Sequence, residues 1–484
     1  MDEIVDNQPL VIIDNDESEN IETLDLTHPY LKYKELAGIL YLDKTFGKKG
    51  KKYLYKCKPY DRTLPCLLIP YEVEIGFQKN FENKYILFEY TDISCKPLQG
   101  ILKRTIGSVN INDEEHYFEY LLYGSYLQLT QTPIKSCVRN YTRIYNPSSI
   151  IDILYKYYKS KKVIHENIFT IDGNDCIEHD DAISICFDKE TQLQKISIYI
   201  SNVHVWFEEM DLWKLFNNES KTVYFPGSRR SMLPSIFTDN FCNLLKGQYR
   251  IVLCYNFYVN NDGEIVNVII ENVVVKIQNN YIYESEELLK QNDYLELLKI
   301  SKQMDSNIIN SYDVVKHWMI QVNKFIGSRF IDEKLNGIFL SSFEKSYEKI
   351  LHEKINGYYT PHYSMDISSK YLQVTSPMRR FVDILNSMKI NRGLFIKGEN
   401  FYIQWLENFD KFNTKFMNIK HIEKKCEMIH MLREQPNFEK EFELKKVYDG
   451  LYTVIGLNRF IFNDDNVTKI KFIESRGKIK KILY

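Results

Sequence analysis

Five carboxylates lie within ten consecutive residues, between two short apolar segments. They are Asp172, Asp175, Glu178, Asp180 and Asp181. Residues 168–171 have the composition of a short buried strand, and residues 182–187 alternate small and large apolar side chains as a second strand would. The sequence therefore predicts a strand–loop–strand unit that holds the acids on a constrained connection.

Carboxylates held this close together have a chemical consequence. They repel one another unless a cation neutralises them, and hard divalent cations prefer several oxygen ligands. Two such ions ~3.5–4 Å apart are a common device for cleaving phosphodiester bonds. A solvated acidic surface loop is the alternative interpretation of the same residues.

Residues 375–383 carry the signature of a helix start. Ser376 is predicted as the N-cap and Pro377 as the first helical residue. A stripe at positions i, i+3, i+4 and i+7 follows, formed by Phe381, Ile384, Leu385 and Met388. This segment is therefore predicted to be a helix that packs on the core.

Arg379 and Asp383 lie four residues apart on another face of this predicted helix. The carboxylate is expected to hold the guanidinium in place. A planar donor fork at a helix N-terminus suits a phosphate. An ordinary surface ion pair is the alternative.

Together the two segments resemble the RNB family, the catalytic domain of ribonuclease II and ribonuclease R. The family pattern T-I-D-x5-D-x-D-D-A is similar to residues 170–182, and its pattern T-S-P-I-R-R-Y-x-D is similar to residues 375–383. Five further blocks resemble the family's I-A-D-V, V-Y-L-P, M-L-P, C-S-L and T-Y-E elements in the same order. They lie at residues 198–203, 223–227, 232–234, 242–244 and 283–284.

The resemblance implies an α+β fold and a set of site residues. A central RNB catalytic domain, a mixed β-sheet with surrounding helices, is expected between small all-β OB-type barrels. Four carboxylates are expected to hold Mg²⁺, with Mn²⁺ as an alternative ion, and to activate the attacking water: Asp172, Glu178, Asp180 and Asp181. Asp180 and Arg379 are expected to be catalytic, with Arg379 stabilising charge on the phosphate in the transition state.

Two tyrosines match aromatic positions that clamp the 3′-terminal bases in the family. These are Tyr224 and Tyr283. Stacking on an aromatic face is physically suited to this role, because it tolerates any base. Core packing is the alternative for both rings.

The chain departs from the family pattern at three places. Glu178 replaces an aspartate, Asn202 replaces another, and residues 387–388 replace a His-Arg pair. None of these changes removes a core catalytic group. The expected function is therefore a 3′-to-5′ exoribonuclease that hydrolyses single-stranded RNA to 5′-nucleoside monophosphates by a two-metal-ion mechanism. The alternative is a catalytically inactive RNA-binding subunit of an RNA-decay assembly, and the resemblance disfavours a DNA nuclease.

The domain organisation is predicted from charge, periodicity and the family's layout. Residues 1–28 contain many acids and no Lys or Arg, which predicts a disordered tail. The further predicted parts are a cold-shock or OB-type RNA-binding region, a linker, the RNB domain with C-terminal helices, and a short, truncated OB-like segment. Their residues are 29–142, 143–164, 165–445 and 446–484.

A run of lysines marks the expected RNA-binding region. Residues 44–58 contain seven lysines and no acid, interleaved with Phe46, Tyr53 and Tyr55. Basic side chains with aromatic neighbours are the face expected for single-stranded RNA, and Lys48, Lys49, Lys51 and Lys52 are the predicted contacts. A solvated lysine loop is the alternative.

The cysteine content, hydropathy and net charge bear on the cellular compartment and on the partners of the protein. The nine cysteines form no C-x-x-C pair, which predicts reduced thiols and a cytoplasmic protein. No apolar run approaches the ~18 residues of a membrane span, so no membrane partner is expected. The net charge of −2 averages an acidic tail and acidic loop against the lysine clusters. Single-stranded RNA is the expected partner, and the sequence identifies no protein partner.

Overall fold

The structure is a computed structural model, and it divides into two compact units that are discontinuous in sequence. One unit comprises Met1–Gln128, Tyr224–Arg229 and Asn418–Tyr484, and the other comprises Leu129–Val223 and Arg230–Met417. The residues described are 35–73, 82–92, 97–110, 113–125, 132–144, 149–216, 220–347, 351–359, 371–391, 393–448, 451–455, 457, 459–462, 467–475 and 478–483. The predicted tail at 1–28 lies outside them.

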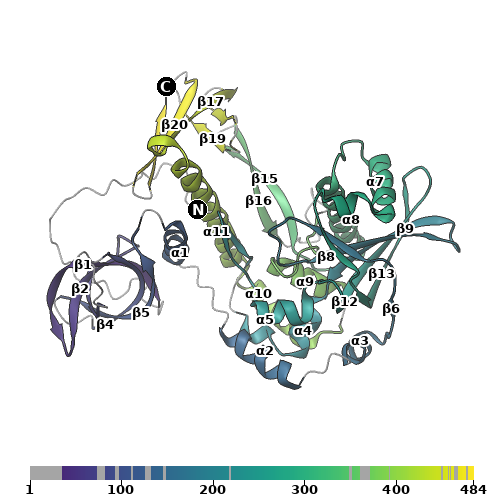
Figure 1. Ribbon diagram of the computed structural model, residues 1–484, viewed down its shortest axis with the longest axis horizontal. Helices are drawn as coiled ribbons and strands as arrows, with labels where there is room; N and C mark the ends of the chain where they lie inside the picture. The colour runs from purple at the N-terminus through teal and green to yellow at the C-terminus, as the bar shows by residue number, and fades with distance from the viewer. Residues whose placement is uncertain are drawn as a thin grey trace. The chain divides into compact units, whose positions relative to one another are not determined.

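The first unit contains a closed five-stranded barrel with the order β1-β2-β3-β5-β4 (Figure 1). Its strands are β1 (Leu36–Lys49), β2 (Lys52–Pro59), β3 (Leu67–Tyr71), β4 (Lys84–Asp92) and β5 (Gln99–Ser108). Leu40, Ile86 and Phe88 are fully buried in its interior. Gly38 allows β1 to approach this core closely, because a Cβ there would lie 2.8 Å from Cys57 Sγ and 2.9 Å from Phe88. The expectation of a small all-β barrel before the catalytic domain is confirmed.

The same unit includes a helix after the barrel, the end of a long helix and a second sheet. The elements are α1 (Glu114–Gly124), the C-terminal part of α11 (Phe409–Arg433), β17 (Glu439–Tyr448), β18 (Leu451–Val454), β19 (Arg459–Phe462), β20 (Lys469–Ser475) and β21 (Lys478–Leu483). The sheet order is β19-β18-β17-β20-β21. Because β17 pairs with β20 from Glu439 onward, the boundary predicted at residue 446 falls inside a strand.

The second unit is built on a seven-stranded mixed sheet with the order β14-β7-β8-β9-β12-β13-β6. The strands are β6 (Val163–Ile164), β7 (Phe169–Asp172), β8 (Asp181–Asp188), β9 (Leu193–Ser201), β12 (Tyr249–Val259), β13 (Ile265–Lys276) and β14 (Asn279–Ile282). The β13–β6 and β14–β7 pairs are parallel, and the other pairs in the sheet are antiparallel. The expected mixed sheet is therefore confirmed.

Helices surround this sheet. They are α2 (Thr132–Ile144), α3 (Ile150–Tyr158), α4 (Val203–Glu209), α5 (Ser235–Phe237), α6 (Glu286–Leu289), α7 (Asn292–Met304), α8 (Ser311–Asp332), α9 (Phe381–Ile390) and α10 (Ile396–Leu406). The helices α7 and α8 lie on one side of the sheet (Figure 1), where Trp318 packs on Phe257 of β12. The hairpin β15 (Phe339–Tyr347) and β16 (Leu351–Tyr359) completes the unit.

The residues predicted to be a linker contain regular structure in their described part. The helix α3 lies there, and Val163 and Ile164 of β6 pair with Val274 and Val275 of β13. The sheet of the second unit therefore begins before the boundary predicted at residue 165. In the described part of the chain, no helix is both long and apolar enough to cross a membrane.

The helix predicted to start at Pro377, with Ser376 as its N-cap, begins later, at Phe381. Residues 377–379 form turns instead, and Lys221 and Arg380 make an isolated antiparallel bridge. The Ser376 backbone N–H donates to the buried carboxylate of Asp383 at 2.8 Å, so the segment before Phe381 folds back over the helix. The predicted apolar stripe is confirmed, since all four of its side chains are fully buried.

Two neighbouring polar residues of α9 allow a test of this packing. Asn386 is fully buried; its Oδ1 accepts from Ile338 N, and its Nδ2 donates to the carbonyl oxygens of Ile338 and Gln373, each at 2.9 Å. Asn386→Ala should lower the free energy of unfolding by about 2–4 kcal/mol in denaturant titrations, because buried backbone groups lose their partners.

Ser387 provides the matched control on the same helix. Its buried hydroxyl has no hydrogen-bond partner among the described residues. Ser387→Ala should therefore change the free energy of unfolding by less than about 0.5 kcal/mol, or stabilise the protein. Equal losses for the two variants would contradict the described packing of α9.

Candidate active site

The acidic residues are delivered by two adjacent strands, as the sequence predicts. Asp172 is the last residue of β7 and Asp181 the first of β8. The strands pair through Phe169 and Ile183. The intervening loop is clamped by Asn243, whose side chain accepts from the His179 backbone N–H at 2.8 Å and donates to the carbonyl of Ile177 at 2.7 Å. The strand–loop–strand interpretation is confirmed, and the loop is fixed from a distant part of the chain.

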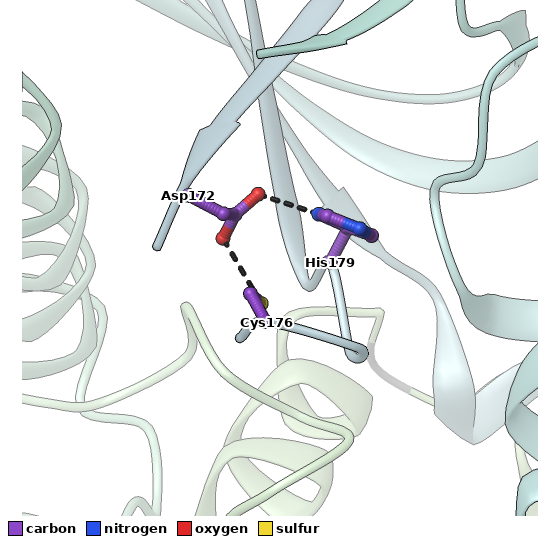
Figure 2. A group of neighbouring side chains, drawn as sticks. All are labelled: Asp172, Cys176 and His179. Atoms are coloured by element: carbon purple, nitrogen blue, oxygen red, sulfur yellow. Dashed lines mark hydrogen bonds and ion pairs between the residues drawn. The ribbon is translucent and has the colours of Figure 1, made fainter. Parts of the chain in front are cut away.

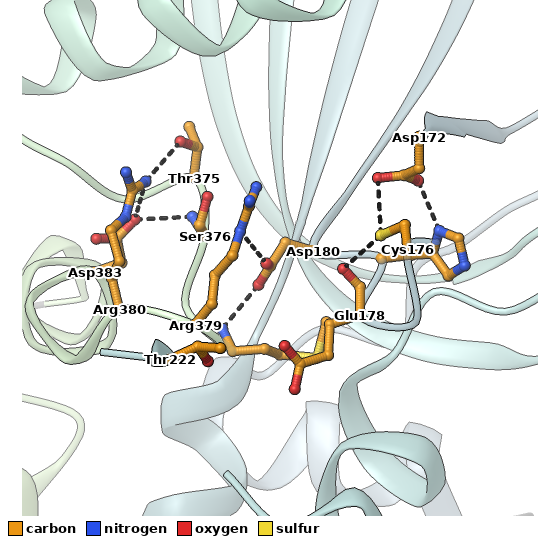
Figure 3. Close-up of polar contacts among 12 residues, drawn as sticks. Asp172, Cys176, Glu178, Asp180, Thr222, Thr375, Ser376, Arg379, Arg380 and Asp383 are labelled. Carbon is orange, nitrogen blue, oxygen red and sulfur yellow. Dashed lines mark hydrogen bonds and ion pairs between the residues drawn. The ribbon is translucent and has the colours of Figure 1, made fainter. Parts of the chain in front are cut away.

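Asp180 is the most constrained of the acids. Its carboxylate is buried and accepts two hydrogen bonds, from the Met378 backbone N–H at 2.7 Å and from Arg379 Nε at 3.0 Å (Figure 3). Burial raises the pKa of Asp180 to about 7, against the opposing effects of the Arg379 charge and the Met378 hydrogen bond. The two residues expected to be catalytic, Asp180 and Arg379, are therefore brought into direct contact.

The predicted ion pair between Arg379 and Asp383 is wrong. Asp383 instead accepts from Arg380 Nη2 at 2.8 Å, while the Nε of Arg379 is 3.0 Å from Asp180 (Figure 3). The turn at residues 377–379 separates the two arginines, because helical spacing does not apply before Phe381. The side chain of Arg379 is 44% exposed, so part of it is open to solvent next to the buried carboxylate.

Asp181 and Glu178 complete the predicted set of carboxylates. Both are buried, at 7% exposure. Burial raises the pKa of Asp181 well above its ordinary value, and the negative charges of Asp172 and Asp180 raise it further. The charge of Glu178 likewise contributes to the raised pKa of Asp180. The four acids are thus electrostatically coupled in a desolvated setting, which a cation would relieve.

The donor chemistry of this set fits an oxygen-seeking cation, but its spacing is not that of a formed site. Among the described residues, no three of these carboxylates have oxygens that all lie within 4.8 Å of one another. Both oxygens of Asp180 accept hydrogen bonds from protein donors, and the same holds for Asp172. Binding an ion between them therefore requires these carboxylates to change partners.

Asp172 lies in a second cluster that the sequence interpretation did not identify. Its Oδ2 is 2.6 Å from His179 Nδ1, and its Oδ1 accepts from Cys176 Sγ at 3.5 Å (Figure 2). Burial and the Asp172 charge raise the pKa of the Cys176 thiol to about 12. Cys176 and His179 occupy variable positions of the motif, so a search for His and Cys near the acids was the only signal that could have found them.

Tyr283, predicted to stack on RNA bases, lies beside the acids. Its backbone N–H donates to the Asp172 carbonyl at 2.9 Å. Burial raises the pKa of its phenol, and the charges of Asp181 and Asp172 contribute. Its ring meets that of Tyr312 edge-on at 5.7 Å, and Tyr312 is 53% exposed. Tyr312 was missed because no motif includes it.

Tyr224 and the predicted lysines belong to the first unit, whereas the carboxylates belong to the second. Tyr224 is 41% exposed on β10 (Val223–Phe225), and its backbone N–H donates to Glu423 of α11 at 2.9 Å. The predicted lysines lie at the β1–β2 turn. There Lys48 lies over the ring of Tyr53 at 4.4 Å, and Lys49 Nζ donates to Gln99 at 2.7 Å.

Comparison with known proteins adds to this geometry. The family model described as "RNB domain" matches residues 161–308. Ribonuclease R of Mycoplasmopsis pulmonis is 26% identical over 220 residues, which cover 41% of this chain and 30% of that protein. Exoribonuclease 2 of Vibrio parahaemolyticus is 31% identical over 109 residues, which cover 22% of this chain and 16% of that protein. The chain thus spans less than a third of the length of these relatives.

Solved structures share the fold over most of the chain. RNase R of Mycoplasma genitalium in complex with double-stranded RNA matches with a TM-score of 0.66 and 13% identity, over 94% of this chain and 96% of that one. Yeast Ssd1, a pseudonuclease, matches with a TM-score of 0.58 and 13% identity, over 91% of this chain and 66% of that one. Together with the ordered motifs and the described sheet, these findings show that residues 161–308 match the RNB domain and that this part of the chain is similar to ribonuclease R and exoribonuclease 2.

Proposed function

We propose that this protein is a divalent-metal-dependent exoribonuclease that hydrolyses single-stranded RNA from the 3′ end and releases 5′-nucleoside monophosphates. The observation that carries the proposal is the buried contact between Asp180 and Arg379, beside the coupled acids of an RNB domain. Mg²⁺ is the proposed ion, with Mn²⁺ as an alternative, because every predicted ligand is a carboxylate. The direction and product are those expected of the family.

The residues that would hold the ion are Asp172, Glu178, Asp180 and Asp181. A bound divalent ion supplies Lewis-acid activation of the phosphate and of the attacking water. Arg379 supplies the complementary charge, since its inner Nε is fixed by Asp180 and part of its side chain reaches the surface. A guanidinium oriented in this way suits a phosphate, because its planar fork is held before substrate arrives.

Aromatic and basic side chains support binding of the RNA. The Tyr283 ring lies near the acids, where it would stack on a base near the 3′ end, and Tyr224 is proposed for the same role. The β1–β2 turn presents Lys48, Lys49, Lys51 and Lys52 together with the exposed ring of Tyr53. The M. genitalium relatives were solved with RNA, which supports RNA as the ligand class.

A second candidate function is a catalytically inactive RNA-binding protein of an RNA-decay assembly. It is favoured by the likeness to Ssd1, a pseudonuclease, and by the protein partners that both Asp172 and Asp180 already have. Glu178, which replaces the family's aspartate, is the position that would decide between the two candidates.

Neutral variants of the acids test the hydrolytic function. Asp180→Asn and Asp181→Asn should each reduce hydrolysis of labelled RNA by at least about 100-fold, because the amide neither binds the ion nor supplies the charge. RNA affinity should stay level or improve, since repulsion of phosphate falls. Asp175→Asn is the matched control, because Asp175 is an exposed acid of the same loop outside the family pattern.

End-labelled oligomers show which nucleic acid is cleaved and from which end. RNA and DNA oligomers labelled at the 5′ or 3′ end, assayed with Mg²⁺ and with EDTA, should show mononucleotide release from the RNA 3′ end only when Mg²⁺ is present. Near-normal activity of either Asn variant, or turnover in EDTA, would contradict the proposed metal-dependent site.

Substitutions at Glu178 separate the two candidate functions. For an active enzyme, Glu178→Asp should change the rate modestly and Glu178→Gln should reduce it by at least about 100-fold, because only the amide loses the negative charge. A wild-type protein that binds RNA without degrading it, and gains activity as Glu178→Asp, would establish the inactive RNA-binding protein instead.

The lysine cluster predicts a salt-dependent contribution to affinity. Replacing Lys48, Lys49, Lys51 and Lys52 together with Ala should flatten the log–log dependence of RNA affinity on salt by roughly two to three units, because each contact to single-stranded RNA contributes about −0.7. Cleavage at saturating RNA should change little. The control carries the same charge change on the second unit, at the exposed residues Lys189, Lys290, Lys299 and Lys302. An unchanged slope in the first variant would place the RNA path elsewhere.

A further inference from the structure

We propose that Asp172, Cys176 and His179 form a binding site for a borderline-soft divalent cation of the Zn²⁺ class. The three side chains come from the end of β7 and the loop that follows it, and they converge on one another (Figure 2). Their ligand atoms all lie within 4.8 Å of one another. Among the described residues, this is the one group of His, Cys, Asp and Glu side chains that meets this spacing.

The contact between Cys176 and Asp172 has the spacing that a tetrahedral ion imposes. With metal–ligand bonds of about 2.0–2.3 Å, neighbouring ligand atoms lie roughly 3.3–3.7 Å apart. The 3.5 Å between Cys176 Sγ and Asp172 Oδ1 falls in this range. His179 Nδ1 lies 2.6 Å from the other oxygen, Asp172 Oδ2, so an ion held through a single oxygen of Asp172 requires rotation of the carboxylate or the imidazole.

The thiol, imidazole and carboxylate of this cluster favour a different ion from the one that a set of carboxylates alone would bind. Thiolate and imidazole ligands favour Zn²⁺, Co²⁺ and related ions, whereas Mg²⁺ prefers oxygen. Three protein ligands leave the fourth tetrahedral position open to water or a phosphate oxygen, as in catalytic rather than structural zinc sites. The side chains of His179 and Asp172 are only 13% and 17% exposed, so the ion would be largely shielded from solvent.

The backbone of each ligand is held by a hydrogen bond of its own. The Asp172 carbonyl accepts from Tyr283 N at 2.9 Å, and Cys176 N donates to the Gly173 carbonyl at 3.0 Å. His179 N donates to Asn243 Oδ1 at 2.8 Å. Ligands positioned by such supporting bonds lose less conformational freedom when an ion binds.

The cluster of Asp172, Cys176 and His179 does not depend on the proposed function. The family pattern fixes the position of Asp172 but leaves the positions of Cys176 and His179 variable. Because Asp172 is also a proposed Mg²⁺ ligand, an ion bound by Cys176 and His179 would compete for that carboxylate. The ligand set itself stands whether or not the protein degrades RNA.

Direct metal binding tests the proposal on the full, tag-free chain. Zn²⁺ titrated against a chromophoric chelator should bind with one equivalent per chain, and excess Mg²⁺ should not displace it. Co²⁺ in its place should give a near-ultraviolet thiolate-to-metal charge-transfer band. Cys176→Ser and His179→Gln should each weaken Zn²⁺ binding more than about 100-fold, beyond the loss typical of a supporting residue, and Cys176→Ser should abolish the Co²⁺ band.

Matched controls and folding measurements complete the test. Cys186→Ser changes a half-buried thiol on β8, and His165→Gln changes an exposed imidazole, and neither should alter binding. Circular dichroism melting in the presence of chelator shows whether each variant is folded. If one of the two ligand variants fails to fold, the other still tests the site. Unchanged Zn²⁺ affinity in both Cys176→Ser and His179→Gln, or no binding by the wild type, would overturn the proposal. Binding of Zn²⁺ by a chain that never cleaves RNA would refute only the proposed function.

Discussion

The need to satisfy the buried carboxylate of Asp180 determines how the segments around it in the second unit are arranged. A desolvated negative charge is costly unless donors surround it, and here the donors are Met378 N and Arg379 Nε, from a segment 198 to 199 residues away in sequence. To deliver both groups, residues 377–379 must turn rather than continue α9 backward. Asp383 stabilises that turn by binding Ser376 N and Arg380. The late start of α9, the position of Arg379 and the burial of the acidic loop are therefore consequences of one contact.

Much of this arrangement follows from local sequence patterns. Alternating apolar residues on either side of the acids predict β7 and β8, because side-chain alternation is a property of each strand alone. The stripe on α9 is predicted for the same reason, since its four members recur with the helical period. The ordered motifs then predict which acids and which arginine meet. These predictions succeed because each depends only on the spacing of residues within one short segment of the sequence.

The features that sequence patterns missed depend on contacts between distant segments. The partner of Arg379 could not be chosen from helical spacing, because the distant carboxylate of Asp180 binds Met378 N and Arg379 Nε where the pattern predicts the first turn of the helix. Cys176 and His179 lie at variable positions of the motif, so only their convergence on Asp172 in space distinguishes them. The boundaries at 165 and 446 fall at strands that pair with residues far along the chain. The assignment of Tyr224 to the first unit is likewise a property of the folded chain.

The long sequence separation between Asp180 and its two donors also determines when, during translation, their contact can first form. Translation proceeds at roughly 5–20 residues per second, so Arg379 leaves the ribosome roughly 10–40 s after Asp180. Until then the strands β7 and β8 can pair, but the Asp180 carboxylate has no arginine to face and must stay hydrated. Formation of the contact between Asp180 and Arg379 is thus a late event in the synthesis of the chain.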